Sequence, residues 1–313
     1  MRKMLRSLTL CAIVVNGAVC PVAAQPHPQS KWGKEDTIGS ANYLTAELAL
    51  GAAELVTTGK VYALGLPVGG SSPAVAPRRM AINILMPGQY GGATLGSNEA
   101  SYLDDMISGW LGVGTQIDGL AHAGRRGVFY NGNKASDFAT PTGVKKLGVE
   151  GIPPIVTRGV LIDIAKHRGV TRLEEGEVIS PEELEAAARE QGVSIREGDV
   201  VIIHTGWISM LDEDPDRFLA GEPGIDRKGA EYLAGKNVVA VGADTWGIDA
   251  VPFKDDTVFD AHVTLLYENG TYLLESLDTR ELASDEVYEF MFVLGQPRFE
   301  GAVQTVVNPV AIK

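Results

Sequence analysis

The sequence predicts an α/β fold of mixed type, in which strands outnumber helices and do not alternate with them strictly. Seven segments are rich in β-branched and aromatic residues and are bounded by glycine or polar turns, which is typical of strands. These segments span residues 60–66, 81–86, 159–165, 199–205, 237–242, 271–277 and 289–295. Helices are expected over residues 181–191, 227–234 and about 258–268. This proportion favours a mixed sheet over a regular repetition of strand and helix.

The clearest helical signature surrounds residues 181–191. Ser180 suits the N-cap, Pro181 suits the first helical position, and Glu183 completes a capping box. Gly192 then ends the helix, because glycine readily adopts the left-handed conformation found after many helices. Asn269-Gly270 closes the third helix in the same way.

The first 24 residues have the organisation of a secretory signal peptide. A basic start is followed by the apolar run LTLCAIVV and by small residues at Val22 and Ala24. The apolar run is too short to span a bilayer. We therefore expect cleavage after Ala24 and a periplasmic or secreted mature protein that has no membrane partner.

The mature chain, residues 25–313, has no internal repeat, low-complexity run or clear linker, so we expect a single domain opened by an irregular arm over residues 25–58. Both cysteines lie in the signal segment, which excludes disulfides and cysteine-based sites. The net charge of −13 argues against nucleic acid as a partner, because an acidic surface repels phosphates. No GxSxG, P-loop or GxGxxG motif indicates a serine hydrolase, an NTPase or a dinucleotide-binding fold.

Residues 112–124, GVGTQIDGLAHAG, place three polar side chains in glycine-rich backbone. If the first half is a strand, Gln116 and Asp118 point to the same face, since side chains alternate with a period of two. Gly119 can turn the backbone and bring His122 back to the same point. Two oxygen donors and an imidazole that converge predict a metal site or acid–base chemistry. Turn formation would explain the glycines and a single Asp, but not this spacing.

Among the remaining histidines, His262 has the most informative context. Glu275 follows it within LLESL, where a buried carboxylate needs a partner such as a metal or an arginine. His204 ends an apolar run and is interpreted either as a buried core histidine or as part of a pocket wall. His27 and His167 are expected to lie outside the site.

GVGTQIDGLAH resembles the signature His-x-Gly-Thr-His-x-Asp-x-Pro-x-His of the cyclase family of metal-dependent hydrolases, which includes kynurenine formamidase and isatin hydrolase. Supporting matches cover nearly all of the mature chain: WGKEDTIGSANYLT at 32–45, RGVLIDIA at 158–165, GDVVIIHTGW at 198–207 and VGADTWGID at 241–249. Gly112 and Gln116 replace the first two signature histidines, and Leu120 replaces the proline.

The resemblance implies a mixed, partly barrel-like sheet with outer helices, the swivelling β/β/α type, and a homo-oligomer, either a dimer or a tetramer. It implies that Asp118, His262 and Glu275 hold a metal, with the carbonyl oxygen of Gln116 as a further ligand. Loss of the first two histidines favours one divalent ion, Mn²⁺ or Zn²⁺, over two. His122 takes the position of the catalytic histidine.

The implied function is hydrolysis of the C–N bond of a small-molecule amide, either a cyclic amide or an N-formyl group, by metal-activated water. Three alternatives stay open: a metal-dependent lactonase, a non-catalytic periplasmic binding protein, and a degraded site without metal. Residues flanking the motifs are candidates for substrate contact: Trp110, Phe129, Tyr130, Trp207, Asp244 and Trp246. Plain core packing of the aromatic residues and a turn cap at Asp244 are the competing interpretations.

Overall fold

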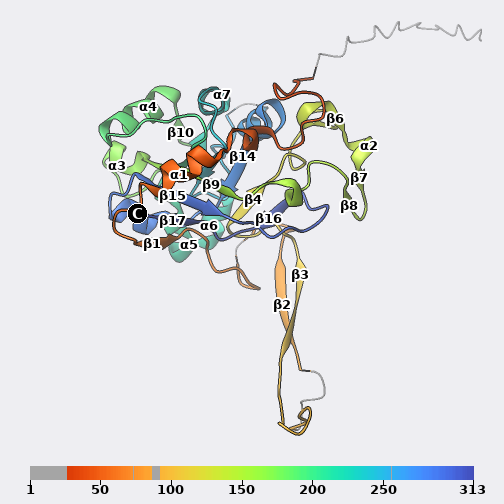
Figure 1. Cartoon of the computed structure of the whole chain (residues 1–313). Helices are drawn as coiled ribbons and strands as arrows, with labels where there is room; N and C mark the ends of the chain where they lie inside the picture. Colours follow the sequence, from red (N-terminus) through yellow and green to blue (C-terminus); the bar gives the residue numbers. More distant parts are fainter. Residues whose placement is uncertain (1–26, 73, 87–91, 255) are drawn as a thin grey trace, which may run out of the picture.

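The computed structural model describes residues 27–72, 74–86, 92–254 and 256–313. The predicted signal peptide lies outside the described residues. A nine-stranded mixed sheet curls through the molecule with helices on its outside, which confirms the predicted fold class (Figure 1). Its order is β1 (Val61–Ala63), β17 (Val310–Ile312), β15 (Glu289–Leu294), β9 (Ile155–Asp163), β11 (Val200–His204), β13 (Ala240–Ala243), β14 (Tyr272–Glu275), β4 (Gln116–Asp118) and β16 (Gln304–Val306).

Four short two-stranded ladders flank the sheet: β2 (Met80–Leu85) with β3 (Asp104–Gly109), β5 (Val128–Phe129) with β6 (Asn133–Lys134), β7 (Ala139–Thr140) with β8 (Gly143–Val144), and β10 (Val178–Ile179) with β12 (Gly224–Ile225). The α-helices are α1 (Ala46–Ala53), α2 (Ala135–Phe138), α3 (Ile164–Arg168), α4 (Pro181–Glu190), α5 (Met210–Glu213), α6 (Pro215–Ala220), α7 (Arg227–Gly235), α8 (Asp260–His262) and α9 (Arg280–Ser284). Short 3₁₀ turns are η1 (Gly39–Tyr43), η2 (Tyr130–Gly132), η3 (Val149–Gly151) and η4 (Trp207–Ser209), and η5 (Val263–Asn269) is a π-helix.

The middle of the sheet is parallel and the flanks are antiparallel. Strands β9, β11, β13 and β14 run parallel, whereas β15, β17, β1, β4 and β16 pair antiparallel to their neighbours. Every residue of β11 and β13 is buried, as expected for strands covered on both faces. All seven predicted strands are found, six of them in this sheet and the seventh as β2.

The three predicted helices are also found. In α4 the Ser180 hydroxyl accepts a hydrogen bond from the Glu183 N–H at 3.2 Å, and Pro181 occupies the first turn. The segment predicted as one helix over 258–268 is α8 followed by η5, which ends at Gly270 in the left-handed conformation.

The expectation of an irregular arm over residues 25–58 is wrong for part of its length, because this segment contains η1 and α1. Thr45 caps α1 by accepting a hydrogen bond from the Leu48 N–H at 3.2 Å. Helix α1 packs against β9 and β15. The Ser40 hydroxyl donates to the Val239 carbonyl at 2.6 Å, and the Tyr272 hydroxyl donates to the Ile38 carbonyl at 2.7 Å. The arm is therefore ordered by its contacts with the sheet.

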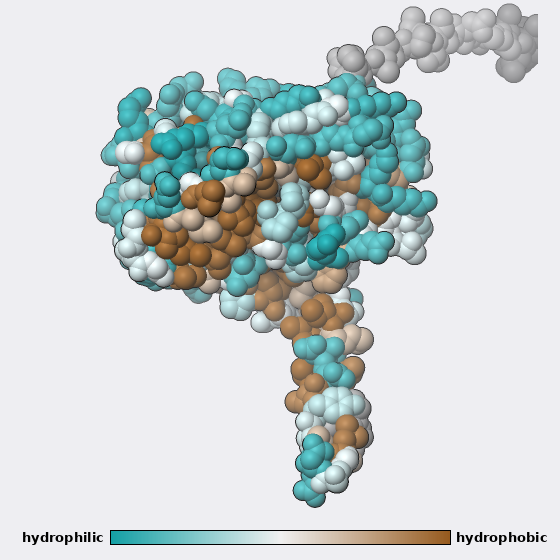
Figure 2. Space-filling view, viewed as in Figure 1, coloured by the Kyte–Doolittle hydropathy of each residue, from teal (hydrophilic) through white to brown (hydrophobic). Residues whose placement is uncertain are grey.

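The β2–β3 hairpin projects from the body as a narrow arm (Figure 1). Ile82 and Ile107 lie opposite each other on it, and Ile84 shares their face. These three side chains are 46%, 59% and 57% exposed, respectively. Figure 2 shows apolar residues along this arm. None of the helices in the described ranges has the length and apolar character needed to cross a bilayer.

Candidate active site

Strands β4 and β14 place three polar side chains on one face of the sheet. Gln116 lies opposite Glu275 in the antiparallel pairing, and Asp118 follows Gln116 by two residues on the same face, as predicted. The Gln116 amide nitrogen donates to Glu275 Oε2 at 2.6 Å and to Asp118 Oδ1 at 3.2 Å. All three residues are buried.

The Gly-Thr pair before β4 fixes the start of this strand. Gly114 has φ +66°, a conformation that L side chains rarely adopt. The Thr115 hydroxyl donates to the Ser276 carbonyl at 2.6 Å and accepts from the Leu66 N–H at 2.9 Å. Thr115 thus ties the beginning of β4 to the end of β14, where Glu275 lies.

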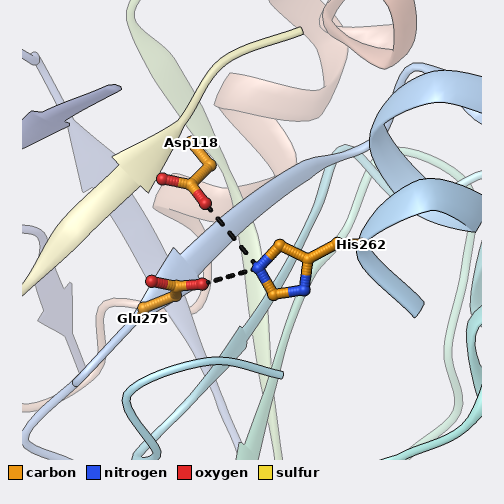
Figure 3. Close-up of side chains that lie close together, drawn as sticks. All are labelled: Asp118, His262 and Glu275. Atoms are coloured by element: carbon orange, nitrogen blue, oxygen red, sulfur yellow. Dashed lines mark hydrogen bonds and ion pairs between the residues drawn. The ribbon is translucent and has the colours of Figure 1, made fainter. Parts of the chain in front are cut away.

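His262 approaches the two carboxylates from α8 (Figure 3). Its Nε2 lies 2.9 Å from Glu275 Oε1 and 3.9 Å from Asp118 Oδ2. Its Nδ1 lies 2.6 Å from Asp249 Oδ2, and Asp249 Oδ1 accepts from the Ala261 N–H at 2.7 Å. When Nδ1 donates its proton to Asp249, the Nε2 lone pair points at Asp118 and Glu275. Asp249 was not among the predicted site residues, although it ends the motif VGADTWGID.

Burial shifts the protonation equilibria at this site. The pKa of Glu275 is raised to about 7, first by burial and then by the charge of Asp118. Burial disfavours the charged form of His262, but hydrogen bonds to Asp249 and Glu275 outweigh burial and raise its pKa well above 6.5. Burial also raises the pKa of Glu222, a fourth carboxyl near His262, whose Oε2 accepts from the Gly247 N–H at 3.0 Å.

The converging side chains fit a divalent metal ion. One ligand atom each from Asp118, His262 and Glu275 lies within 4.8 Å of the other two. Metal–ligand bonds of about 2.0–2.2 Å require ligand atoms roughly 3–3.5 Å apart, which small rotations of these side chains would achieve. Asp118 Oδ2 is buried and has no hydrogen-bond partner among the described residues, so it is the one of these three ligand atoms that most needs a cation.

Gln116 lies beside this cluster in a different orientation from the one expected of a metal ligand. Its amide nitrogen, and not its carbonyl oxygen, faces Asp118 and Glu275. Carboxylate oxygens accept hydrogen bonds from N–H donors and repel a carbonyl oxygen, which can only accept. The structure therefore corrects the prediction: Gln116 orients the two carboxylates, with no carbonyl oxygen turned toward the cluster.

His122 returns to the site through the predicted turn. The backbone N–H of His122 donates to the Gly119 carbonyl at 2.9 Å, and its ring Nε2 lies 3.5 Å from Asp118 Oδ2. Burial lowers the pKa of His122 below its ordinary value of 6.5; the charge of Asp118 opposes this fall, and the charges of His262 and Arg78 add to it. The imidazole is thus held in its neutral form, which can accept a proton.

A cavity of about 450 Å³ opens beside these groups. Its wall includes His122, His262, Glu275, Arg78, Trp246 and Phe259. The apolar residues 75–77 and Ala123 complete it. This volume is in the range of pockets that bind small molecules. Arg78 was not predicted, because no local motif connects it with the residues of β4 and β14.

Of the six residues predicted to contact substrate, Trp246 lines this cavity and the others do not within the described chain. Trp207 is fully buried in a separate apolar cluster with Phe218. Asp244 is fully buried and accepts hydrogen bonds from Thr205 N and Oγ1 and from Gly206 N, at 2.9, 2.6 and 2.8 Å. Asp244 therefore holds the turn that follows β11, nearly 40 positions earlier in the chain, and does not line the cavity.

The other three aromatic residues also have different roles. The Tyr130 hydroxyl donates to Asp36 Oδ2 at 2.6 Å and anchors the N-terminal arm. Phe129 packs edge-on against Phe138, with ring centroids 5.7 Å apart. Trp110 is 41% exposed beside the root of the β2–β3 arm. These side chains were expected near the motifs by sequence proximity, but the backbone turns direct them elsewhere.

His204 is a buried core histidine and does not line the cavity. Its Nδ1 lies 2.6 Å from Thr279 Oγ1 and 3.3 Å from Asp244 Oδ2. Burial opposes its charged form, but Asp244 outweighs burial and raises its pKa. The other two histidines lie outside the cavity wall: His27 contacts the Tyr267 hydroxyl, and His167 contacts Glu190.

Comparisons with known proteins agree with this architecture. The Cyclase family model matches residues 32–250. The crystal structure of a novel cyclase is 29% identical, with a TM-score of 0.83 over 92% of this chain and 100% of that one. Isatin hydrolase A from Ralstonia solanacearum is 21% identical (TM-score 0.62; 86% and 98% covered), and a "predicted metal-dependent hydrolase" from Bacillus stearothermophilus is 18% identical (TM-score 0.52; 82% and 98% covered). The last two show a shared fold. No curated protein sequence matches the chain.

Proposed function

The chain belongs to the cyclase family, and from this membership we propose that it is a metal-dependent hydrolase that cleaves the C–N bond of a small amide, either a cyclic amide or an N-formyl group. The observation that carries the proposal is the convergence of Asp118 Oδ2, His262 Nε2 and Glu275 Oε1 beside a cavity that His122 also lines. Hydrolase neighbours of the same fold support it.

Asp118, His262 and Glu275 would hold one divalent ion, Mn²⁺ or Zn²⁺. When bound, such an ion lowers the pKa of water and polarises a carbonyl group. The residue at position 112 also favours a single ion, because Gly112 offers no ligand where the family signature has a histidine. A Cβ atom at this position would meet the Gln304 side chain and lie 3.1 Å from Arg78 Nη1, so the ends of these two side chains occupy the space instead.

His122 supplies the proton transfers of the proposed reaction. Its neutral imidazole accepts a proton from the attacking water and then donates it to the leaving nitrogen. Asp249 holds the His262 ring in one orientation, and Gln116 holds the two carboxylates. Trp246 and Phe259 form an apolar wall that limits access of bulk water to the reacting groups.

A substrate panel with purified mature protein tests this proposal. We expect hydrolysis of an N-formyl aniline or a cyclic amide, loss of activity on treatment with a chelator, and recovery with Mn²⁺ or Zn²⁺. Glu275→Gln should abolish activity, whereas Glu281→Gln, an exposed glutamate, should not. Turnover of lactones alone would establish the lactonase alternative. Metal-free protein that binds substrates without turning them over would favour the binding-protein alternative.

We also propose that the chain forms a homo-oligomer through its β2–β3 arm. An isolated two-stranded hairpin is marginally stable in water, and this arm exposes the apolar face formed by Ile82, Ile84 and Ile107. A second copy of the chain would cover this face in a symmetric contact. The predicted signal peptide supports a periplasmic or extracellular location for the mature chain.

A further inference from the structure

Arg78 brings a positive charge to the wall of the active-site cavity. It lies just before β2, at the root of the arm, where Figure 1 shows the hairpin joining the body below β4 and β16. Its Nη1 donates to the Gly112 carbonyl at 3.3 Å, a long hydrogen bond. Among the residues that the structure describes, no carboxylate lies within 4.0 Å of the guanidinium. Most of the five N–H donors of this group are therefore available to a ligand.

The position of Arg78 is constrained by the residues around Gly112. The absence of a side chain at Gly112 leaves the space that the Arg78 guanidinium and Gln304 occupy. The half-buried Arg78 is thus held in the cavity wall by its neighbours.

The rest of the cavity wall suits an aromatic or apolar body. Trp246 and Phe259 contribute aromatic surface, and segments 75–77 contribute small apolar side chains. A cavity with one unpaired guanidinium and aromatic walls is complementary to an aromatic molecule that carries a carboxylate.

We propose that Arg78 is a specificity-determining residue that binds a carboxylate of the substrate, so that the cavity prefers aromatic amides bearing this group. The inference deepens the proposed hydrolase function and rests on it. The guanidinium forms two parallel hydrogen bonds to the carboxylate, which places the scissile amide of the same molecule between His122 and the cluster of Asp118, His262 and Glu275.

Binding titrations without turnover test this proposal independently of hydrolysis. Calorimetry compares benzoate with benzamide, which has the same shape without the charge, on the mature protein with its metal content measured. We expect benzoate to bind roughly ten- to hundredfold more tightly, as for hydrogen bonds to charged groups. Arg78→Gln should remove this preference, and Arg78→Lys should retain part of it, because lysine keeps the charge but lacks the planar fork. Arg79→Gln is the matched control, since Arg79 is exposed and does not line the cavity.

Three outcomes would overturn the proposal. Wild-type protein that binds both ligands equally, or neither at millimolar concentration, would show that the cavity has no carboxylate subsite. A preference that survives Arg78→Gln and disappears on chelation would assign anion binding to the metal. Equal loss of the benzoate preference in Arg78→Gln and Arg79→Gln would show that the preference comes from positive charge in general and not from a contact with Arg78. If the protein hydrolyses neutral amides and any of these outcomes is observed, the proposed hydrolase function is retained and the role of Arg78 in substrate specificity is rejected.

Discussion

Replacing His122 and His262 separately by alanine distinguishes proton transfer from metal binding. His262 Nε2 lies within the cluster formed with Asp118 and Glu275, whereas His122 belongs to the cavity wall, with its ring centroid 6.4 Å from that of His262. His262→Ala removes one of three ligand atoms. Replacing a residue that only hydrogen-bonds to a metal ligand lowers metal affinity roughly 10- to 100-fold. We expect a larger loss for His262→Ala, because a ligand itself is removed.

His122→Ala should keep its metal and lose rate. A positioned proton-transfer group accelerates a reaction roughly 10²- to 10⁴-fold, so kcat should fall by that factor. The pKa of His122 is lowered from 6.5, so its neutral form prevails at pH 7 and is lost as the pH falls through that lowered pKa. Wild-type activity should therefore decline on the acid side below pH 6.5, and His122→Ala should lack this decline.

The assay is metal content by elemental analysis, together with a pH–rate profile on an amide that the wild type hydrolyses. His167→Ala is the matched control, because His167 pairs with Glu190 and lies outside the active-site cavity wall. It should keep both metal and rate. A metal-free His122→Ala beside a metal-loaded His262→Ala would reverse the two roles. Full metal and full rate in both variants would refute the assignment of this site.

Four further outcomes are expected. Dialysed protein should contain close to one equivalent of divalent metal, and two equivalents by elemental analysis would contradict the single-ion site. Asp249→Asn should weaken metal binding about 10- to 100-fold in competition with a chromophoric chelator, because the Nδ1 partner of His262 changes; unchanged affinity would remove its orienting role. Ile107→Asp should give a smaller species by light scattering, whereas Val170→Asp, also at an exposed apolar position, should not; equal masses would exclude the arm as the interface. N-terminal sequencing of protein from its native host should begin at Gln25, and an intact Met1 would disprove cleavage.

Local patterns in the sequence were sufficient for six of the nine strands of the sheet and for α4, whereas β16 and β17 were not predicted. Side chains alternate along any strand, so the spacing of Gln116 and Asp118 placed both on one face before their neighbours were known. Capping depends on residues within one turn, so Ser180 and Pro181 predicted the start of α4. Strand β3 was missed because DDMISG lacks the alternation of a half-buried strand, and all six of its residues are exposed.

The polar cluster itself was predictable in part. Asp118, His262 and Glu275 were expected together through the resemblance to a family signature, and the structure places them together. Asp249 could have been suspected from its place at the end of VGADTWGID, which precedes His262 by 13 residues. Aromatic neighbours of the motifs were less predictable, because nearness in sequence does not determine the direction of a side chain after a turn.

The sequence by itself determined the period of each strand, the ends of the main helix and the residue types able to hold a metal, since these depend on covalent geometry and on neighbours within a few residues. Only the tertiary structure decided which side chains meet. Arg78 and Gln304 lie 226 positions apart in the sequence and share the space beside Gly112, and Gln116 turns its amide nitrogen toward Glu275, 159 positions away. Packing between distant segments sets such contacts, and their energies depend on burial and on the charges brought together, which no short stretch of sequence contains.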